Sequence, residues 1–331
     1  MAVNLTPQYL EAEQEYKRAQ TAEERLECLK TMWALVPKHK ASEKLQAELK
    51  TKMSAAREEV EHERKVGKKG GGVSYKIPRQ GAGQVIVLGG PNTGKSRLLT
   101  CLTRATPEVA AYPFTTREPH AGMMEWEDVR VQLIDTPPIT ADFLEGYLSS
   151  MVRAADAALL LVDVADDDGP FAAEAVLERL AGVKTVLAGQ PPVEPPDASI
   201  HHTKTLLLAT KAAAPGAADR LEMVRELFGS RFPIQALDAE AGQGLEETRT
   251  AIYRLLDVIR VYSKRPSKPA DMASPFTCRR GSTVQQFAEV VHRDFVDKLK
   301  SARIWGTGVF DGQTVTRDHV LHDRDVVELH V

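Results

Sequence analysis

The sequence Gly-Gly-Pro-Asn-Thr-Gly-Lys-Ser at Gly89–Ser96 is the feature that most constrains the fold of this chain. It has the spacing Gly-x-x-x-x-Gly-Lys-Ser, and it directly follows the apolar run Val85–Leu88 and precedes a helical pattern. A strand, a glycine-rich turn and a helix N-terminus in this order form a cradle whose backbone N–H groups face a phosphate. A glycine-rich surface turn would not explain the strand, the spacing and the serine together. The pattern therefore predicts an α/β P-loop domain that binds nucleoside triphosphates, with a mostly parallel sheet and helices on both faces.

The sequence downstream repeats this strand–helix alternation. Apolar runs at 131–135, 158–163 and 206–209 predict three further buried strands. Helices are expected over 95–103, 142–154, 170–181, 217–228 and 246–259, and the proline-rich stretch 190–197 is expected to be a surface loop.

Breaks in this pattern divide the chain into three parts. Residues 1–70 are predicted to be an α-helical arm, with helix starts at Thr6-Pro7, at Thr21 with Glu24, and at Ser42, and a stop at Pro37. Its apolar stripe (Leu45, Leu49, Met53, Val60) is expected to pack on neighbouring helices or on the next domain rather than on a foreign helix. The nucleotide-binding domain is expected over 80–262, after the glycine-rich linker 67–72.

The last part, 266–331, is predicted to be a small α+β domain. The segment Pro266–Pro269 is interpreted as a linker. A strand is expected near Phe276, and a helix that Ser282 caps with Gln285 as its partner. Two further strands are expected at 302–305 and 326–331.

Composition excludes several classes of protein. Of 331 residues 43% are hydrophobic and 27% charged, and no apolar run approaches the roughly 20 residues of a membrane helix. The N-terminus lacks an apolar signal sequence, so we expect a cytoplasmic protein without membrane contact. The three cysteines are expected to be reduced. The net charge is −3, with an acidic middle and mildly basic flanks; such a small basic excess is more often a solvated surface than a nucleic-acid interface.

The phosphate loop identifies the first candidate binding residues. The glycines allow backbone N–H groups to turn toward the β-phosphate, Lys95 is expected to bridge the β- and γ-phosphates, and the Ser96 hydroxyl is a ligand for Mg²⁺. The predicted contacts of this loop with the nucleotide are Gly89, Pro91, Asn92, Thr93, Gly94, Lys95, Ser96 and Arg97.

Two further elements are expected at the γ-phosphate. The loop Phe114-Thr115-Thr116 follows the first helix, where a mobile switch would cross the γ-phosphate, and Thr116 is the predicted second Mg²⁺ ligand. Asp135 ends an apolar strand, from which its carboxylate can hold the Mg²⁺ shell through a water. The predicted catalytic residues are thus Lys95, Thr116 and Asp135.

Together these motifs resemble those of the developmentally regulated GTP-binding (DRG) proteins of the Obg superfamily. The resemblance rests on the segment 37–50, the run Ala110–Thr116, Arg279–Val284 and Asp318–Leu329, and it covers most of the chain. It implies that the C-terminal part is a TGS domain with a ubiquitin-like β-grasp fold, which in the wider family contacts RNA or ribosomal partners. It also implies that Thr210 and Lys211 contact the nucleobase, together with Gln235, Ala236 and Leu237, where the family has Ser-Ala.

Three departures from the family qualify this expectation. Asp135-Thr136-Pro137-Pro138 replaces Asp-x-x-Gly, and Pro138 has no N–H with which to sense a γ-phosphate, which predicts a damped switch. Ala213 replaces the aspartate that reads guanine, so the preference for GTP over ATP is open. Only about fifty residues separate Asp163 from Thr210, so the subdomain inserted there in eukaryotic relatives is expected to be missing.

The leading functional interpretation is a slow, Mg²⁺-dependent GTPase that binds GTP and GDP and docks on the ribosome or RNA through its TGS domain. One alternative is a nucleotide-binding adaptor that no longer hydrolyses and has a ribosomal, RNA or protein partner. Another is an ATPase with degraded guanine specificity. Asn92 is a candidate K⁺ ligand, although a turn-forming role explains it equally well.

Overall fold

The computed structural model describes residues 9, 22–36, 49–53, 77–103, 119–195 and 197–330, in two units, 1–74 and 75–331. In the first unit, α2 (Ala22–Leu35) begins directly after Thr21 and ends before Pro37, as predicted. Apolar side chains of this unit form their own core, which includes Leu49 and Met53 of the predicted stripe. The predicted caps at Thr6-Pro7 and Ser42 lie outside the described residues. None of the helices in the described ranges is long and apolar enough to cross a membrane.

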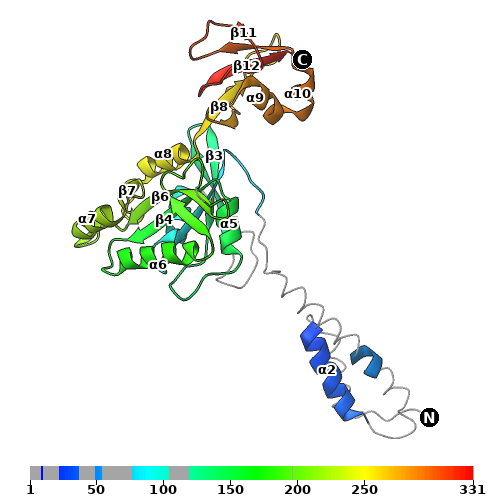
Figure 1. The fold of residues 1–331 in the computed structure, drawn as a ribbon, viewed down its shortest axis with the longest axis vertical. Coiled ribbons are helices and arrows are strands. Elements are labelled where there is room, and N and C mark those ends of the chain that lie inside the picture. The colour runs from blue at the N-terminus through cyan, green and yellow to red at the C-terminus, as the bar shows by residue number, and fades with distance from the viewer. Residues whose placement is uncertain are drawn as a thin grey trace. The chain divides into compact units, whose positions relative to one another are not determined.

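The second unit begins with a seven-stranded sheet in the order β2-β3-β1-β4-β6-β5, with β7 beside β6 (Figure 1). All neighbouring strands are parallel except β2 and β3, which form an antiparallel hairpin. The strands are β1 (Gln84–Gly89), β2 (His120–Trp126), β3 (Val129–Asp135), β4 (Ala157–Asp163), β5 (Thr185–Ala188), β6 (His201–Thr210) and β7 (Ile234–Ala236).

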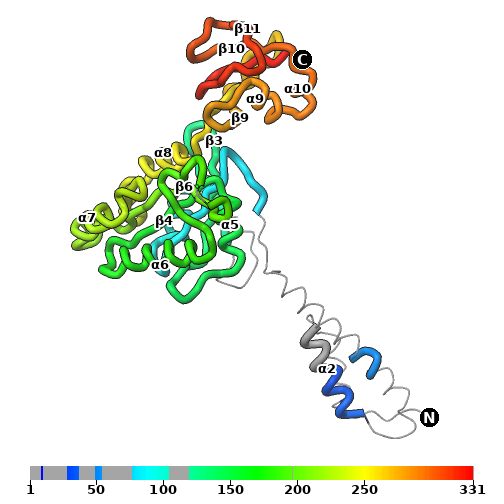
Figure 2. Tube along the Cα trace, viewed as in Figure 1, coloured from blue at the N-terminus to red at the C-terminus, as the bar shows by residue number. Residues whose placement is uncertain are grey.

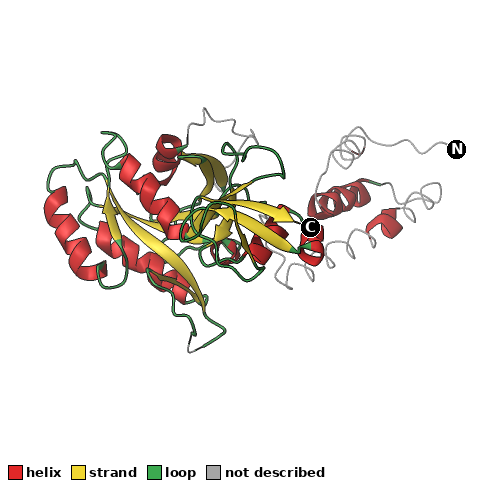
Figure 3. Ribbon diagram, turned by 90° about the horizontal axis from the view of Figure 1, so that it is seen from above, coloured by secondary structure: helices red, strands yellow, loops and turns green. Residues whose placement is uncertain are grey.

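Helices cover both faces of this sheet, because each central strand sends alternate apolar side chains to opposite faces. Ile86 and Leu88 of β1 join one buried cluster with α5, α6 and α7, and Val85 and Val87 join another with α4 and α8. Figure 3 shows the helices on either side of the yellow strands. The helices are α4 (Lys95–Leu102), α5 (Leu148–Ala154), α6 (Gly169–Ala181), α7 (Ala217–Phe228) and α8 (Leu245–Leu256).

The chain then forms a second, five-stranded sheet in the order β11-β10-β12-β8-β9. Figure 2 follows the chain from the cyan and green first domain through the yellow helix α8 into this orange and red domain. Phe287 of α9 is fully buried in its core, against an edge-on Phe276 ring 5.8 Å away. The elements are β8 (Val258–Ser263), β9 (Phe276–Arg279), α9 (Val284–Val291), α10 (Arg293–Lys298), β10 (Ser301–Trp305), β11 (Gln313–Val315) and β12 (Asp325–His330).

A buried arginine connects this domain to the β2–β3 hairpin of the first sheet. The Arg260 side chain on β8 is 4% exposed and forms ion pairs with Asp128 (2.9 Å) and Glu127 in the hairpin turn and with Asp323 (2.7 Å) before β12. Its guanidinium lies 5.1 Å from the ring centre of Trp126, and Tyr262 donates a hydrogen bond to Asp128. We call these residues, with Arg324, the Arg260 cluster.

Three local predictions were wrong. The helix expected to run to Ile259 ends at Leu256, because Asp257 is left-handed (φ 53°) and β8 follows at once. The helix expected from Asp142 begins only at Leu148, because Thr140 and Phe143 close a hydrogen-bonded turn. The helix cap near 282 lies one residue later than predicted.

That cap, Thr283, carries a testable prediction. The Thr283 side chain accepts the N–H of Gln286, and the Gln286 side chain accepts the N–H of Thr283 at 2.9 Å. Loss of an N-cap costs about 1 kcal/mol. Thr283→Ala should therefore speed amide hydrogen exchange in α9 about fivefold. Ser282→Ala, at the originally predicted cap, is the matched control, and equal effects of the two variants would contradict the assignment.

Candidate nucleotide-binding site

The phosphate loop joins β1 to α4 with the backbone that the sequence pattern requires. Gly89 (φ 155°), Asn92 (φ 57°) and Gly94 (φ 87°) all adopt positive φ. A Cβ on Gly89 would lie 2.9 Å from the Leu161 carbonyl oxygen and the Thr93 hydroxyl, so only glycine fits there. The left-handed conformation of Asn92 is what a turn-forming asparagine adopts, and the K⁺ role stays a prediction.

Lys95 lies over this loop and is only 7% exposed. Its ammonium donates hydrogen bonds to the carbonyl oxygens of Gly90 (2.6 Å) and Gly89 (3.2 Å). Burial lowers the pKa of Lys95 below its ordinary value, and the nearby carboxylate of Asp135 partly opposes this shift. The site thus concentrates a positive charge beside the helix N-terminus, where a phosphate is favoured.

Ser96 and Asp135 meet next to this charge, from α4 and the end of β3. The Ser96 hydroxyl donates to Asp135 Oδ2 at 2.5 Å, whereas the buried Oδ1 has no hydrogen-bond partner among the described residues. An unpaired buried carboxylate oxygen is unfavourable unless a cation or a water occupies its free position. A hydroxyl and a carboxylate are the oxygen ligands that Mg²⁺ prefers, so these residues fit the expected metal.

The segment after Asp135 is held against the phosphate loop. The Thr136 hydroxyl donates to the Val87 carbonyl (2.6 Å), and the N–H of the buried Ile139 donates to the Gly89 carbonyl (3.2 Å). Pro138, between these two anchors, is exposed and lines a cavity of about 530 Å³ above the loop. Pro138, which has no backbone N–H to donate, therefore lies at the wall of the phosphate cavity.

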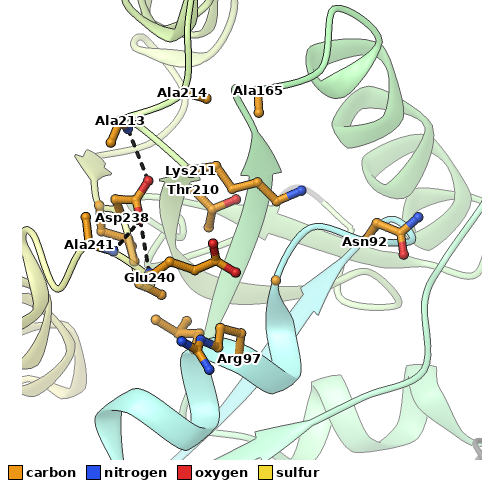
Figure 4. Close-up of a pocket in the computed structure, with 14 residues that line it drawn as sticks. Asn92, Arg97, Ala165, Thr210, Lys211, Ala213, Ala214, Asp238, Glu240 and Ala241 are labelled. Carbon is orange, nitrogen blue, oxygen red and sulfur yellow. Dashed lines mark hydrogen bonds between the residues drawn. The ribbon is translucent and has the colours of Figure 1, made fainter.

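A second cavity has a volume of about 560 Å³ (Figure 4). It shares Asn92, Gly94 and Arg97 with the first. Thr210 ends β6 at its wall, and its hydroxyl lies 2.9 Å from the Thr93 carbonyl and 3.1 Å from that of Val162. Lys211 also lines the cavity and forms an ion pair with Asp163 at the end of β4. Thr210 therefore connects the phosphate loop to the expected nucleobase pocket.

Only one of the three residues predicted for the opposite wall lies at the cavity. Leu237 lines the cavity, but Gln235 and Ala236 do not. The reason is that β7 continues through Ala236, which pairs with Ala209 inside the sheet, and Gln235 lines a different cavity beside α8. The wall is instead the loop that follows β7, with Asp238, Ala239, Glu240 and Ala241.

Asp238 and Glu240 were not among the predicted site residues, because no strand was predicted at 234–236 and nothing in the local sequence marked the loop after it. The predicted switch residues Phe114, Thr115 and Thr116 lie outside the described residues. Of the phosphate-loop residues predicted to contact the nucleotide, Asn92, Gly94 and Arg97 line both cavities, and Pro91, Lys95 and Ser96 line the first.

Comparisons with known proteins agree with this arrangement. Residues 84–190 match the family described as 50S ribosome-binding GTPase, and residues 259–331 match the TGS domain family. Among solved structures, the chain is similar in fold to the YchF GTPase of Schizosaccharomyces pombe, with a TM-score of 0.52 and 14% sequence identity. That alignment covers 77% of this chain and 100% of the YchF chain.

Three relatives are similar over most of their length. A GTP-binding protein of Methanocaldococcus jannaschii is 27% identical over 88% of both chains. Developmentally-regulated G-protein 2 of Arabidopsis thaliana is 26% identical over 92% of this chain and 90% of its own. Ribosome-interacting GTPase 1 of Saccharomyces cerevisiae is 26% identical over 93% of this chain and 99% of its own. The chain thus carries a GTPase domain followed by a TGS domain, and its homologues are developmentally regulated GTP-binding proteins and other GTP-binding proteins of this type.

Proposed function

We propose that this protein is a slow, Mg²⁺-dependent GTPase. The observation that supports this most directly is the Ser96–Asp135 pair beside the Lys95 ammonium, in which one carboxylate oxygen has no partner in the part of the chain that the structure describes. These groups come from α4 and from the end of β3, which meet at one edge of the sheet, where ligands of such folds bind. Phosphoryl transfer needs positioning and electrostatic stabilisation more than covalent chemistry, and this site supplies both.

Each residue has a distinct role in this proposal. Lys95 binds the β- and γ-phosphates and neutralises charge on them, and the backbone N–H groups of the loop orient them. Ser96 and Thr116 hold Mg²⁺, and Asp135 accepts a hydrogen bond from its water shell. The metal would neutralise charge on the β- and γ-phosphate oxygens.

The main alternative is a nucleotide-binding adaptor that hydrolyses GTP too slowly to matter. Two features favour it: Pro138 supplies no N–H to a γ-phosphate, and Ile139 ties the adjacent backbone to the Gly89 carbonyl. Losing a hydrogen bond to a charged group costs on the order of 1.5–3 kcal/mol, so this switch would respond weakly to GTP.

We further propose that the C-terminal domain binds the ribosome or RNA in the cytoplasm. The support for a ribosomal partner is the name of the yeast relative and the description of the family that residues 84–190 match. The C-terminal domain is proposed as the contact because residues 259–331 match the TGS domain family. A test is co-sedimentation of the purified chain with ribosomes in the presence of GDP or a non-hydrolysable GTP analogue, with and without prior nuclease treatment. Absence from the ribosomal pellet with both nucleotides would reject this partner.

The nucleotide proposal is tested by competition of GTP, GDP and ATP against a fluorescent guanine nucleotide, with Mg²⁺, followed by measurement of phosphate release. We expect guanine-selective binding and slow release that EDTA abolishes. Binding without release would favour the adaptor, and equal or tighter binding of ATP would favour an ATPase. Replacing Na⁺ by K⁺ in the release assay tests the Asn92 prediction, because a K⁺ ligand would make release faster in K⁺.

A further inference from the structure

The nucleobase cavity lacks a carboxylate on one wall and has one on the opposite wall. Thr210, Lys211 and Ala213 all line this cavity, but the Ala213 side chain is a methyl group, which cannot accept a hydrogen bond from a base. The Ala213 N–H donates a hydrogen bond of 3.2 Å to Asp238 Oδ2 (Figure 4). The Asp238 carboxylate therefore lies directly beside the position that has no acceptor.

Asp238 is held in one orientation by its own loop. Its Oδ1 accepts the N–H groups of Ala241 (2.8 Å) and Glu240 (3.0 Å), and its backbone forms two hydrogen bonds with Gln243. The residue is only 8% exposed. The hydrogen bond from the Ala241 N–H is the main cause of a lowered pKa of Asp238, and burial opposes it. The hydrogen bonds from the N–H groups of Ala213 and Glu240 lower this pKa further. The group is thus a fixed, ionised acceptor at neutral pH.

The acceptor has capacity left for a ligand. A carboxylate offers about four lone-pair positions, and three backbone N–H groups occupy three of them. The remaining position is on Oδ2, the oxygen that has Ala213 as its single donor in the described part of the chain. Guanine presents two donors on one edge, N1–H and the 2-amino group, whereas adenine presents the acceptor N1 there.

We propose that Asp238 determines guanine specificity in this protein, with Oδ2 accepting a hydrogen bond from the N1–H or 2-amino edge of the base in place of a side chain at residue 213. This inference rests on the proposed function, because it needs a guanine nucleotide in the site. The nearby Glu240 carboxylate also lines the cavity, but its side chain is exposed and no hydrogen bond of its carboxylate is found among the described residues. It lacks the fixed geometry that discrimination requires.

The variant Asp238→Asn tests this directly, because the loop dictates the orientation of the new amide. The N–H groups of Glu240 and Ala241 need the carboxamide oxygen at the Oδ1 position, which leaves the NH₂ group at the Oδ2 position. That NH₂ repels the donors of guanine and suits the 2-oxo group of xanthine. A purely structural role for Asp238 would weaken all purine nucleotides alike.

The measurement is displacement of a fluorescent GDP from the full-length chain by GDP, IDP, XDP and ADP with Mg²⁺. The fluorescent nucleotide carries its label on the ribose, so the base is unmodified. In Asp238→Asn we expect the affinity for GDP to fall about 10- to 100-fold and the affinity for XDP to rise at least about tenfold. The ratio of the two affinities should therefore fall by more than the loss of GDP affinity alone would produce. Glu240→Gln is the matched control and should keep the wild-type preference. An unchanged preference in Asp238→Asn, or a lost preference in Glu240→Gln, would overturn the inference.

A second pair of variants decides the matter if Asp238→Asn does not fold. Asp238→Ser should lose the preference for GDP over XDP, and adding Ala213→Asp should restore it by returning a carboxylate to the other wall. No restoration in a folded double variant would count against the inference. The two failures can be told apart, because a wild-type chain that binds no guanine nucleotide rejects the proposed function, whereas tight GDP binding with an unchanged preference in the variants rejects only the role of Asp238.

Discussion

Substituting Lys95 by alanine is expected to weaken the binding of both GDP and GTP by at least about 100-fold, the largest single effect in the molecule. The Lys95 ammonium is the buried cation of the phosphate cavity, next to Ser96 and the glycine-rich turn. Each charge-assisted hydrogen bond that it makes to a phosphate is worth about 1.5–3 kcal/mol, and about 1.4 kcal/mol corresponds to tenfold in affinity. Isothermal titration with GDP and Mg²⁺ measures the loss.

Arg225→Ala, at an exposed ion pair with Glu222 on α7, is the control and should leave nucleotide affinity unchanged. Lys95→Ala also releases the carbonyl oxygens of Gly89 and Gly90, so circular dichroism must show that the variant is folded. A folded Lys95→Ala protein with wild-type affinity would mean that the phosphate loop is not the nucleotide site.

Substituting Arg260 by alanine is expected to destabilise the second unit by about 3–5 kcal/mol, the usual cost of removing one partner from a buried ion pair. The change leaves Glu127, Asp128 and Asp323 without their shared cation. Burial alone would lower the pKa of Arg260, but the hydrogen bonds that its guanidinium donates to these carboxylates raise it. Chemical denaturation followed by the fluorescence of Trp126, whose ring faces the guanidinium, measures the loss.

The control is Arg324→Ala, which removes a cation from the same cluster at an exposed site. Arg324 pairs with Glu127 at 2.6 Å, but its side chain is 60% exposed, and such pairs contribute about 0–1 kcal/mol. If Arg260→Ala costs no more than Arg324→Ala, the cluster does not hold the two domains together.

The same cluster predicts a response to acid. Burial would raise the pKa of Asp128, but hydrogen bonds from Tyr262 and Arg260 lower it. Hydrogen bonds from Arg260 likewise lower the pKa of Asp323 against the effect of burial. A carboxylate with a lowered folded-state pKa contributes its full stabilisation above its unfolded value of about 4 and loses it as the pH falls through the folded value. The contact between the domains should therefore weaken below about pH 4.

The parts of the fold that depend on neighbouring residues in the sequence could be predicted, whereas the parts that depend on long-range contacts could not. The strands β1, β3, β4 and β6 were predicted because strands buried on both faces are continuous apolar runs. The strand β2 was not, because its sequence His-Ala-Gly-Met-Met-Glu-Trp serves a partly exposed edge that only pairing with β3 makes regular. The Arg260 cluster joins residues more than 130 positions apart in the chain, which no local pattern can indicate.

The candidate site divides in the same way. The phosphate loop is contiguous in the sequence, so its residues could be named as a group, and Pro91, Asn92, Gly94, Lys95, Ser96 and Arg97 line the two cavities. The nucleobase wall was predicted from the resemblance of Gln235-Ala236-Leu237 to the family's Ser-Ala. Of these residues only Leu237 lines the cavity, because the register of β7 against β6 carries the strand through Ala236. The substitution at Ala213 was visible, but its neighbour Asp238 became apparent only when the fold brought the two together.

The β2–β3 hairpin extends from the phosphate cavity to the Arg260 cluster, so it joins the nucleotide site to the C-terminal domain. Seven residue pairs run from His120 and Asp135, at the phosphate cavity, to Trp126 and Val129, next to the Arg260 cluster. The coupling between two binding sites on one cooperative element is reciprocal. If nucleotide binding changes the affinity of the C-terminal domain for a partner, then that partner changes the affinity for the nucleotide by the same factor. A partner of the TGS domain would then act as an exchange regulator without touching the nucleotide, and the strength of the Arg260 cluster would set the upper limit of its effect.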